Sequence, residues 1–337
     1  MSSQPNSHKG PLPPAWRQYL SGATRLVYYV VLGWFLYQVA AHYGPELWPR
    51  LSDIDLAMLI ASIVALTLAY LSVSLGIQQI LKLIGQPLQL SLVAKAYALS
   101  QPAKYIPGGI WHLPGRVILY RRYGVPTLAG SAALFWELTT TSLAAAILGI
   151  LASGRGLTDT HLLPVVTAIG LAALISCLAV LFLPIASLSE WLSHRQIRLP
   201  VPVTVATSRR SRGERAYHWV LALGGFMFSW TLTGVAFWIM VLSVVAGAAS
   251  PIALVGIFSA GWVIGFVTVF APGGVGIREI VLALLLAGIF PEPYPVVIAA
   301  MSRIWWTLAE VIVVLIGLSI PIPMDKAPAA PPVADRP

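Results

Sequence analysis

The chain has 337 residues, of which 58% are hydrophobic and only 10% charged, and its mean hydropathy is +0.81. A soluble domain carries about 25% charged residues, so this composition excludes an ordinary water-soluble globule and predicts an integral membrane protein. The formal charge of +9 is spread between apolar segments, which favours contact with anionic lipid over binding of nucleic acid. The single cysteine, Cys177, can form neither an intramolecular disulfide nor a thiolate metal site.

Apolar segments long enough to cross a bilayer follow one another along the chain. A tail at each end, 1–19 and 321–337, lacks apolar periodicity, and we expect both tails to be disordered. A basic loop over 188–216 separates an N-terminal membrane half, 20–187, from a C-terminal half, 217–320. The apolar runs predict six spanning helices, at about 20–41, 56–80, 127–151, 161–187, 217–246 and 295–319. The first run could instead be the core of a signal peptide, although no convincing small-residue cleavage site follows it.

The basic residues are concentrated in alternate connections between these helices. The stretches before the first helix, after the second and after the fourth are rich in Lys and Arg, whereas the other connections are mainly acidic. Lys and Arg in short loops usually stay on the cytoplasmic side of a membrane. We therefore expect both termini to be cytoplasmic.

Two further segments, 86–122 and 251–290, are apolar but interrupted by Pro and Gly. Each contains a Pro-Gly-Gly sequence, at 107–109 and at 272–274, in corresponding positions of the two membrane halves. Paired interruptions of this kind are typical of transporter binding sites. We therefore expect an all-α integral membrane fold, with six spanning helices and two Pro/Gly-broken re-entrant hairpins arranged as an inverted repeat. Segment 251–290 could also be two short crossings joined by a glycine turn, because both arrangements return the chain to the same side.

The sequence around the two breaks carries a resemblance to a known family. Residues 101–116 read QPAKYIPGGIWHLPGR, and residues 272–279 read PGGVGIRE. Over about 20–320 the chain resembles the flippase-like transmembrane domain family of lysylphosphatidylglycerol synthases, as a stand-alone relative without the soluble synthase domain. The resemblance implies a multi-pass protein of a prokaryotic plasma (inner) membrane that moves an anionic lipid between leaflets. Lysine transfer to lipid is not implied, because no long hydrophilic stretch is present.

Each Gly-Gly break leads into a predicted helix start, where free N–H groups and the positive end of the helix dipole favour an anion. Cationic side chains nearby would add to this attraction. The glycines could alternatively serve only turns and packing, and Lys104 and Arg116 could extend to the cytoplasmic head groups. The candidate substrate-binding residues are Lys104, Gly108, Gly109, His112, Arg116, Gly273, Gly274 and Arg278.

A few charged residues fall inside or beside the apolar runs, where charge is costly and usually faces a cavity or a partner. Arg303 and Glu310 fall on the same face of one predicted helix. Together with Arg278, the charged residues of the apolar runs predict a polar path between the two hairpins. The alternative is a charge cluster that only holds the helices together. The predicted path residues are Glu137, Glu279, Arg303 and Glu310.

Metal and cofactor sites are not expected, because the histidines and the cysteine lack ligand spacing and no phosphate-binding loop or dinucleotide motif is present. The favoured function is a lipid flippase, not an enzyme, whose partner is an anionic phospholipid or a polyprenyl-phosphate-linked sugar. Two alternatives stay open: a membrane enzyme with Glu137, Glu279 or His112 as acid or base, and a scaffold for a lipid-modifying enzyme. The sequence leaves open the head group, the direction and energy source of transport, and whether the chain forms a homo-oligomer.

Overall fold

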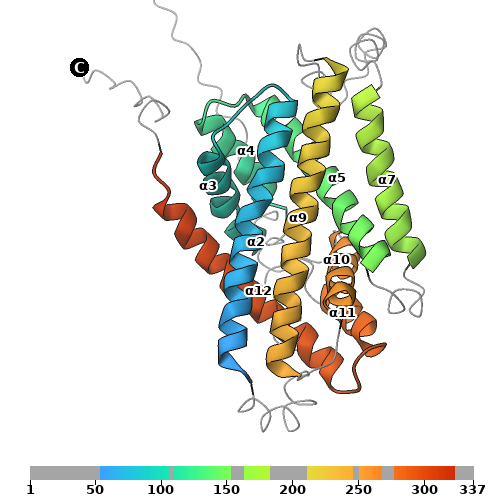
Figure 1. The fold of residues 1–337 in the computed structure, drawn as a ribbon. Helices are drawn as coiled ribbons and strands as arrows, with labels where there is room; N and C mark the ends of the chain where they lie inside the picture. Colours follow the sequence, from blue (N-terminus) through green and yellow to red (C-terminus); the bar gives the residue numbers. More distant parts are fainter. Residues whose placement is uncertain are drawn as a thin grey trace, which may run out of the picture.

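Every regular element in the described part of the chain is a helix (Figure 1). The computed structural model describes residues 54–105, 110–152, 163–182, 211–245, 250–267 and 277–322. Four of its helices are long and apolar enough to cross a membrane: α2 (Leu56–Leu83), α5 (Thr127–Ala152), α9 (Arg212–Val244) and α12 (Tyr294–Ser319). The described part of the chain is therefore all-helical and contains four helices of the kind that span membranes.

These four helices correspond to four of the six predicted spans. The predicted helix at 161–187 is observed as α7 (Leu163–Phe182). The predicted helix at 20–41, the N-terminal tail and most of the C-terminal tail lie outside the described residues, as does the greater part of the 188–216 loop.

The end of that predicted loop is helical, which corrects its boundary. Helix α9 begins at Arg212 because Ser211 and Glu214 form a capping box: the Ser211 hydroxyl accepts from the Glu214 N–H, and the Glu214 carboxylate accepts from the Ser211 N–H. Because the first turn of α9 is polar, apolar residues alone do not predict where this helix begins.

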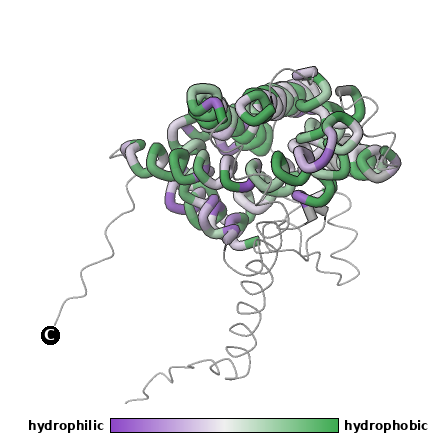
Figure 2. Tube along the Cα trace, turned by 90° about the horizontal axis from the view of Figure 1, so that it is seen from below, coloured by the Kyte–Doolittle hydropathy of each residue, from purple (hydrophilic) through white to green (hydrophobic). Residues whose placement is uncertain are grey.

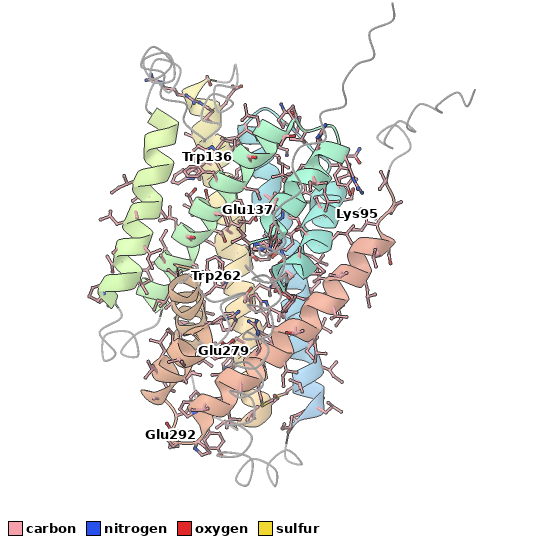
Figure 3. The ribbon with its side chains drawn as sticks, turned by 180° about the vertical axis from the view of Figure 1, so that it is seen from behind. Lys95, Trp136, Glu137, Trp262, Glu279 and Glu292 are labelled. Atoms are coloured by element: carbon pink, nitrogen blue, oxygen red, sulfur yellow. The ribbon has the colours of Figure 1, made fainter. Side chains whose placement is uncertain are left out.

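The two segments that contain Pro-Gly-Gly are each built from short helices on either side of a break. The first segment holds α3 (Leu90–Ser100), the 3-10 helix η2 (Gln101–Tyr105) and α4 (His112–Arg122), and the second holds α10 (Pro251–Val267) and α11 (Ile277–Ala287). Helices α3 and α4 lie toward one end of the bundle, and α10 and α11 toward the other (Figures 1 and 3). The four predicted site glycines, Gly108, Gly109, Gly273 and Gly274, lie outside the described residues.

Long apolar faces of the bundle are exposed. On α2, Leu56, Ile60, Val64 and Leu68 recur every fourth residue and are each more than half exposed. The outer helices are hydrophobic when the molecule is seen from below (Figure 2). An aqueous protein rarely exposes apolar stripes of this length, whereas lipid chains would cover them.

Helices α2 and α9 pack side by side as an antiparallel pair. The Asp55 N–H donates to the Ser243 carbonyl over 3.0 Å at one end, and His218 contacts Gln79 over 3.0 Å at the other. Lys82 lies in the last turn of α2 and Arg212 in the first turn of α9, so basic residues gather at the second end.

Small residues allow the two helices to approach closely. A Cβ built on Gly225 of α9 would lie 2.9 Å from the backbone nitrogen of Gly76 on α2, whereas one built on Gly224 would meet nothing within 4 Å. Close contact through glycine is typical of helix packing in membranes.

We expect Gly225→Ala to lower the free energy of unfolding by about 1–3 kcal/mol, because the two backbones must separate. Its neighbour provides a matched control: Gly224→Ala should be neutral or stabilise the helix by up to about 1 kcal/mol. Unfolding of the purified protein in detergent measures both. Equal effects of the two substitutions would show that α2 and α9 do not meet at Gly225.

Candidate functional site

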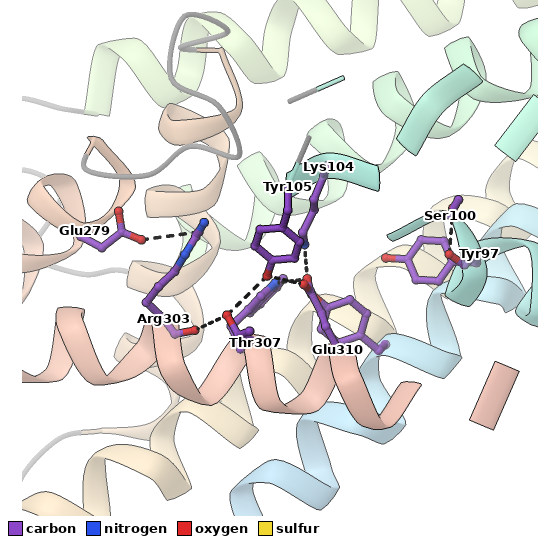
Figure 4. Close-up of polar contacts among 10 residues, drawn as sticks. Tyr97, Ser100, Lys104, Tyr105, Glu279, Arg303, Thr307 and Glu310 are labelled. Atoms are coloured by element: carbon purple, nitrogen blue, oxygen red, sulfur yellow. Dashed lines mark hydrogen bonds and ion pairs between the residues drawn. The ribbon is translucent and has the colours of Figure 1, made fainter. Parts of the chain in front are cut away.

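The centre of the site is one face of α12. Arg303, Thr307 and Glu310 follow one another along this face at helical spacing, and the Thr307 hydroxyl donates to the Arg303 carbonyl over 2.9 Å (Figure 4). Glu310 is only 3% exposed, whereas Leu308 on the same helix is 48% exposed. The polar face of α12 therefore points into the protein.

Four donors from three elements converge on the Glu310 carboxylate. Tyr105 donates to Oε2 over 2.6 Å, and the Trp306 indole N–H donates to Oε1 over 2.6 Å. The Tyr70 hydroxyl of α2 and the Lys104 ammonium of η2 also donate to Oε1. Glu310 and these four donors are called the Glu310 cluster below. Its hydrogen bonds join α2 and the first broken segment to α12.

The second broken segment reaches the same face of α12. Glu279 of α11 lies 3.7 Å from the Arg303 guanidinium. The neighbouring Arg278 stacks its guanidinium on two rings, 4.4 Å from the centre of Trp306 and 4.8 Å from that of Phe258. Lys104 lies 6.0 Å from the Trp306 ring. Cations that flank the two breaks are therefore held against one tryptophan.

The charges at this meeting point do not balance. Lys104 is paired with Glu310 and Arg303 with Glu279, whereas Arg278 contacts aromatic rings. Arg278 is 9% exposed, and its Nη2 has no hydrogen-bond partner among the residues that the structure describes. The break residues, 106–109 and 268–276, contain no ionisable side chain. Among the described residues the site thus carries one uncompensated positive charge, which a low-dielectric surrounding makes costly without an anion.

A third ion pair, fully buried, lies beside the first broken segment. Arg116 of α4, 2% exposed, pairs with Glu137 of α5 and donates from Nε to the Ser100 hydroxyl over 3.1 Å. Its guanidinium lies 4.5 Å from the centre of the Tyr97 ring. Like Lys104, Arg116 points into the protein toward a carboxylate, so neither side chain extends to the head groups as the alternative reading of the sequence had it.

Aromatic contacts connect the Glu310 cluster to the Arg116–Glu137 pair. The rings of Tyr70 and Tyr97 lie 6.3 Å apart, and each ring belongs to one of the two sites. The four predicted path residues consequently fall in one row of contacts: Glu279 with Arg303, then the Glu310 cluster, then Tyr97, then Arg116 with Glu137. Figure 3 shows Glu279 and Glu137 at the two ends of this row, in the lower and upper halves of the molecule. That the row lines a path for substrate remains a prediction.

The remaining predicted residue, His112, is half-buried at the start of α4. Sequence reasoning missed the uncharged members of the site. Tyr105 follows Lys104 in the chain, and Trp306 and Thr307 lie between Arg303 and Glu310. Their closeness in sequence to predicted site residues could have indicated that they belong to the site. Nothing local in the sequence marks Tyr70, which lies in an apolar run.

Lys95 was also missed as a structural residue. Its ammonium is buried and donates to the carbonyl of Gly317 over 3.0 Å, and also to the carbonyls of Leu318 and Ile320. A cation at this end of a helix is favoured by the helix dipole. Lys95 thereby fastens the end of α12 to α3.

Among the described residues, no group of three or more His, Cys, Asp or Glu side chains is placed to hold a metal ion. Searches of protein-family models and of curated protein sequences find no match to this chain. The function must therefore be argued from the fold and the site.

Proposed function

We propose that this protein moves an anionic lipid between the two leaflets of a prokaryotic plasma membrane by alternating access. One observation carries the proposal: Lys104 from the first broken segment and Arg278 from the second lie against the same ring, that of Trp306, with positive charge in excess. A site shared by two interrupted segments suits a ligand that must be reached first from one side and then from the other.

The arrangement proposed for the whole chain is an inverted repeat of six spanning helices and two re-entrant hairpins. Its support is that α3 and α4 lie toward one end of the bundle while α10 and α11 lie toward the other (Figure 1). The basic ends of α2 and α9 support cytoplasmic termini.

Each predicted residue then has a role. The anionic head group binds the cations at the breaks, the row of polar contacts shields it, and the acyl or prenyl chains stay against the exposed apolar faces. The substrate-binding set is Lys104, Gly108, Gly109, His112, Arg116, Gly273, Gly274 and Arg278, and the path set is Glu137, Glu279, Arg303 and Glu310. Lys104 and Arg116 would exchange a carboxylate partner for the lipid during the cycle.

Leaflet exchange in vesicles tests the function. The full chain is reconstituted with a trace of fluorescent phosphatidylglycerol, the label in the outer leaflet is quenched, and the extracted lipid is analysed chemically. We expect exchange well above that of protein-free vesicles, with the lipid unchanged and phosphatidylcholine exchanged more slowly. A modified lipid would instead indicate an enzyme, and neither exchange nor modification would indicate a scaffold.

A further inference from the structure

The charge count at the meeting point of the two broken segments bears on which head group the site accepts. Three cations, Lys104, Arg278 and Arg303, face two carboxylates on two different helices, Glu279 on α11 and Glu310 on α12. The carboxylates are buried, at 6% exposed for Glu279 and 3% for Glu310, so water does little to screen them. With three cations and two carboxylates, one cation has no fixed negative charge to match it.

Among the described residues, Arg278 is the cation left without a matching carboxylate. A guanidinium does not lose its proton in a protein, so this charge cannot be removed by titration. Its Nη2 is buried and lacks a hydrogen-bond partner within the described part of the chain, while the rest of the group stacks on Phe258 and Trp306. A bound oxyanion would supply both the missing acceptor and the missing charge.

We propose that Glu279 and Glu310 set the charge of the accepted lipid: they leave one positive charge, so the site takes a head group with a single negative charge, as in a phosphodiester, and rejects a dianionic phosphomonoester. This inference rests on the proposed lipid transport and assigns the two carboxylates as specificity-determining residues. The second negative charge of a monoester would have no cation left to match it and would add to the two fixed carboxylates, Glu279 and Glu310, and like charges in such a site repel strongly.

Replacing either glutamate with glutamine should make the site prefer a dianionic head group to a monoanionic one. Glu310→Gln keeps one acceptor oxygen, which can take the place of Oε1 for Tyr70 and Trp306. It raises the excess to two positive charges, and Glu279→Gln does the same from another helix. Both variants then match a dianion. Because the substitutions lie on different helices, misfolding of one leaves the other as a test.

The experiment measures binding of phosphatidylglycerol and phosphatidic acid to the full chain in nanodiscs of phosphatidylcholine at pH 8, where a phosphomonoester is largely dianionic. We expect the wild type to bind phosphatidylglycerol at least about tenfold more tightly than phosphatidic acid, and each Gln variant to prefer phosphatidic acid. Glu292→Gln, which removes an exposed carboxylate remote from the site, should keep the wild-type ratio (Figure 3).

Two different failures are distinguishable. If the wild type binds both anionic lipids equally, or if the folded Gln variants keep the wild-type ratio, the charge-matching proposal is wrong although lipid binding stands. If neither anionic lipid binds better than phosphatidylcholine, the proposed function fails as well.

Discussion

Replacing Arg116 with methionine is expected to lower the free energy of unfolding by about 3–5 kcal/mol, because the substitution leaves the Glu137 carboxylate buried without its cation. Arg116 and Glu137 are among the most enclosed charged residues of the described chain, at 2% and 6% exposed. One Glu137 oxygen already lacks a hydrogen-bond partner in the described structure, so no second donor from those residues replaces the guanidinium. Unfolding of the full chain in detergent, followed by circular dichroism, measures the loss.

The double variant Arg116→Met with Glu137→Leu provides the control. Apolar side chains of similar volume remove both charges together, so most of the lost stability should return. Two results would contradict this account of the pair: a single substitution that costs less than about 1 kcal/mol, or a double variant no more stable than the single one.

The second large effect concerns Arg278, which forms no ion pair with a carboxylate of the described residues. We expect Arg278→Met to slow exchange of labelled phosphatidylglycerol at least about 30-fold, since loss of one partner of a buried charge pair costs about 2–5 kcal/mol. The folded structure should tolerate the change, because methionine retains contact with Phe258 and Trp306 and relieves an uncompensated buried charge.

Arg121→Met serves as the matched control for this measurement, because Arg121 is an exposed arginine in the last turn of α4. It should leave exchange within about twofold of the wild type, as expected of a solvated surface charge. Exchange by the Arg278 variant at the wild-type rate would exclude this arginine from head-group binding.

Much of the helical framework could be predicted from the sequence, because the length of an apolar run and the position of Pro and Gly are local properties. The limits of α2, α5 and α12 were predicted to within a few residues. The start of α9 was placed too late because its first turn is polar and begins with a capping box. Segments 86–122 and 251–290 were correctly expected to contain paired short helices.

The individual residues of the candidate site could be predicted from the sequence, but the contacts between them could not. The cost of charge in an apolar run singled out Glu137, Arg303 and Glu310 without any knowledge of the fold. Their partners are set by packing between distant segments: Lys104 and Glu310 are separated by 206 positions, and Tyr70 and Glu310 by 240. No periodicity encodes such contacts.

Photo-crosslinking from α12 tests the central claim, that the two broken segments form a shared site for an anionic lipid head group. A benzoylphenylalanine at position 306 would stand where the Trp306 ring meets Lys104 and Arg278, and one at position 308 would face outward as a control. In vesicles that contain labelled phosphatidylglycerol and labelled phosphatidylcholine, we predict that position 306 captures mainly phosphatidylglycerol while position 308 captures both without preference. Equal capture of the two lipids at position 306, or no capture there while position 308 is labelled, would contradict the account.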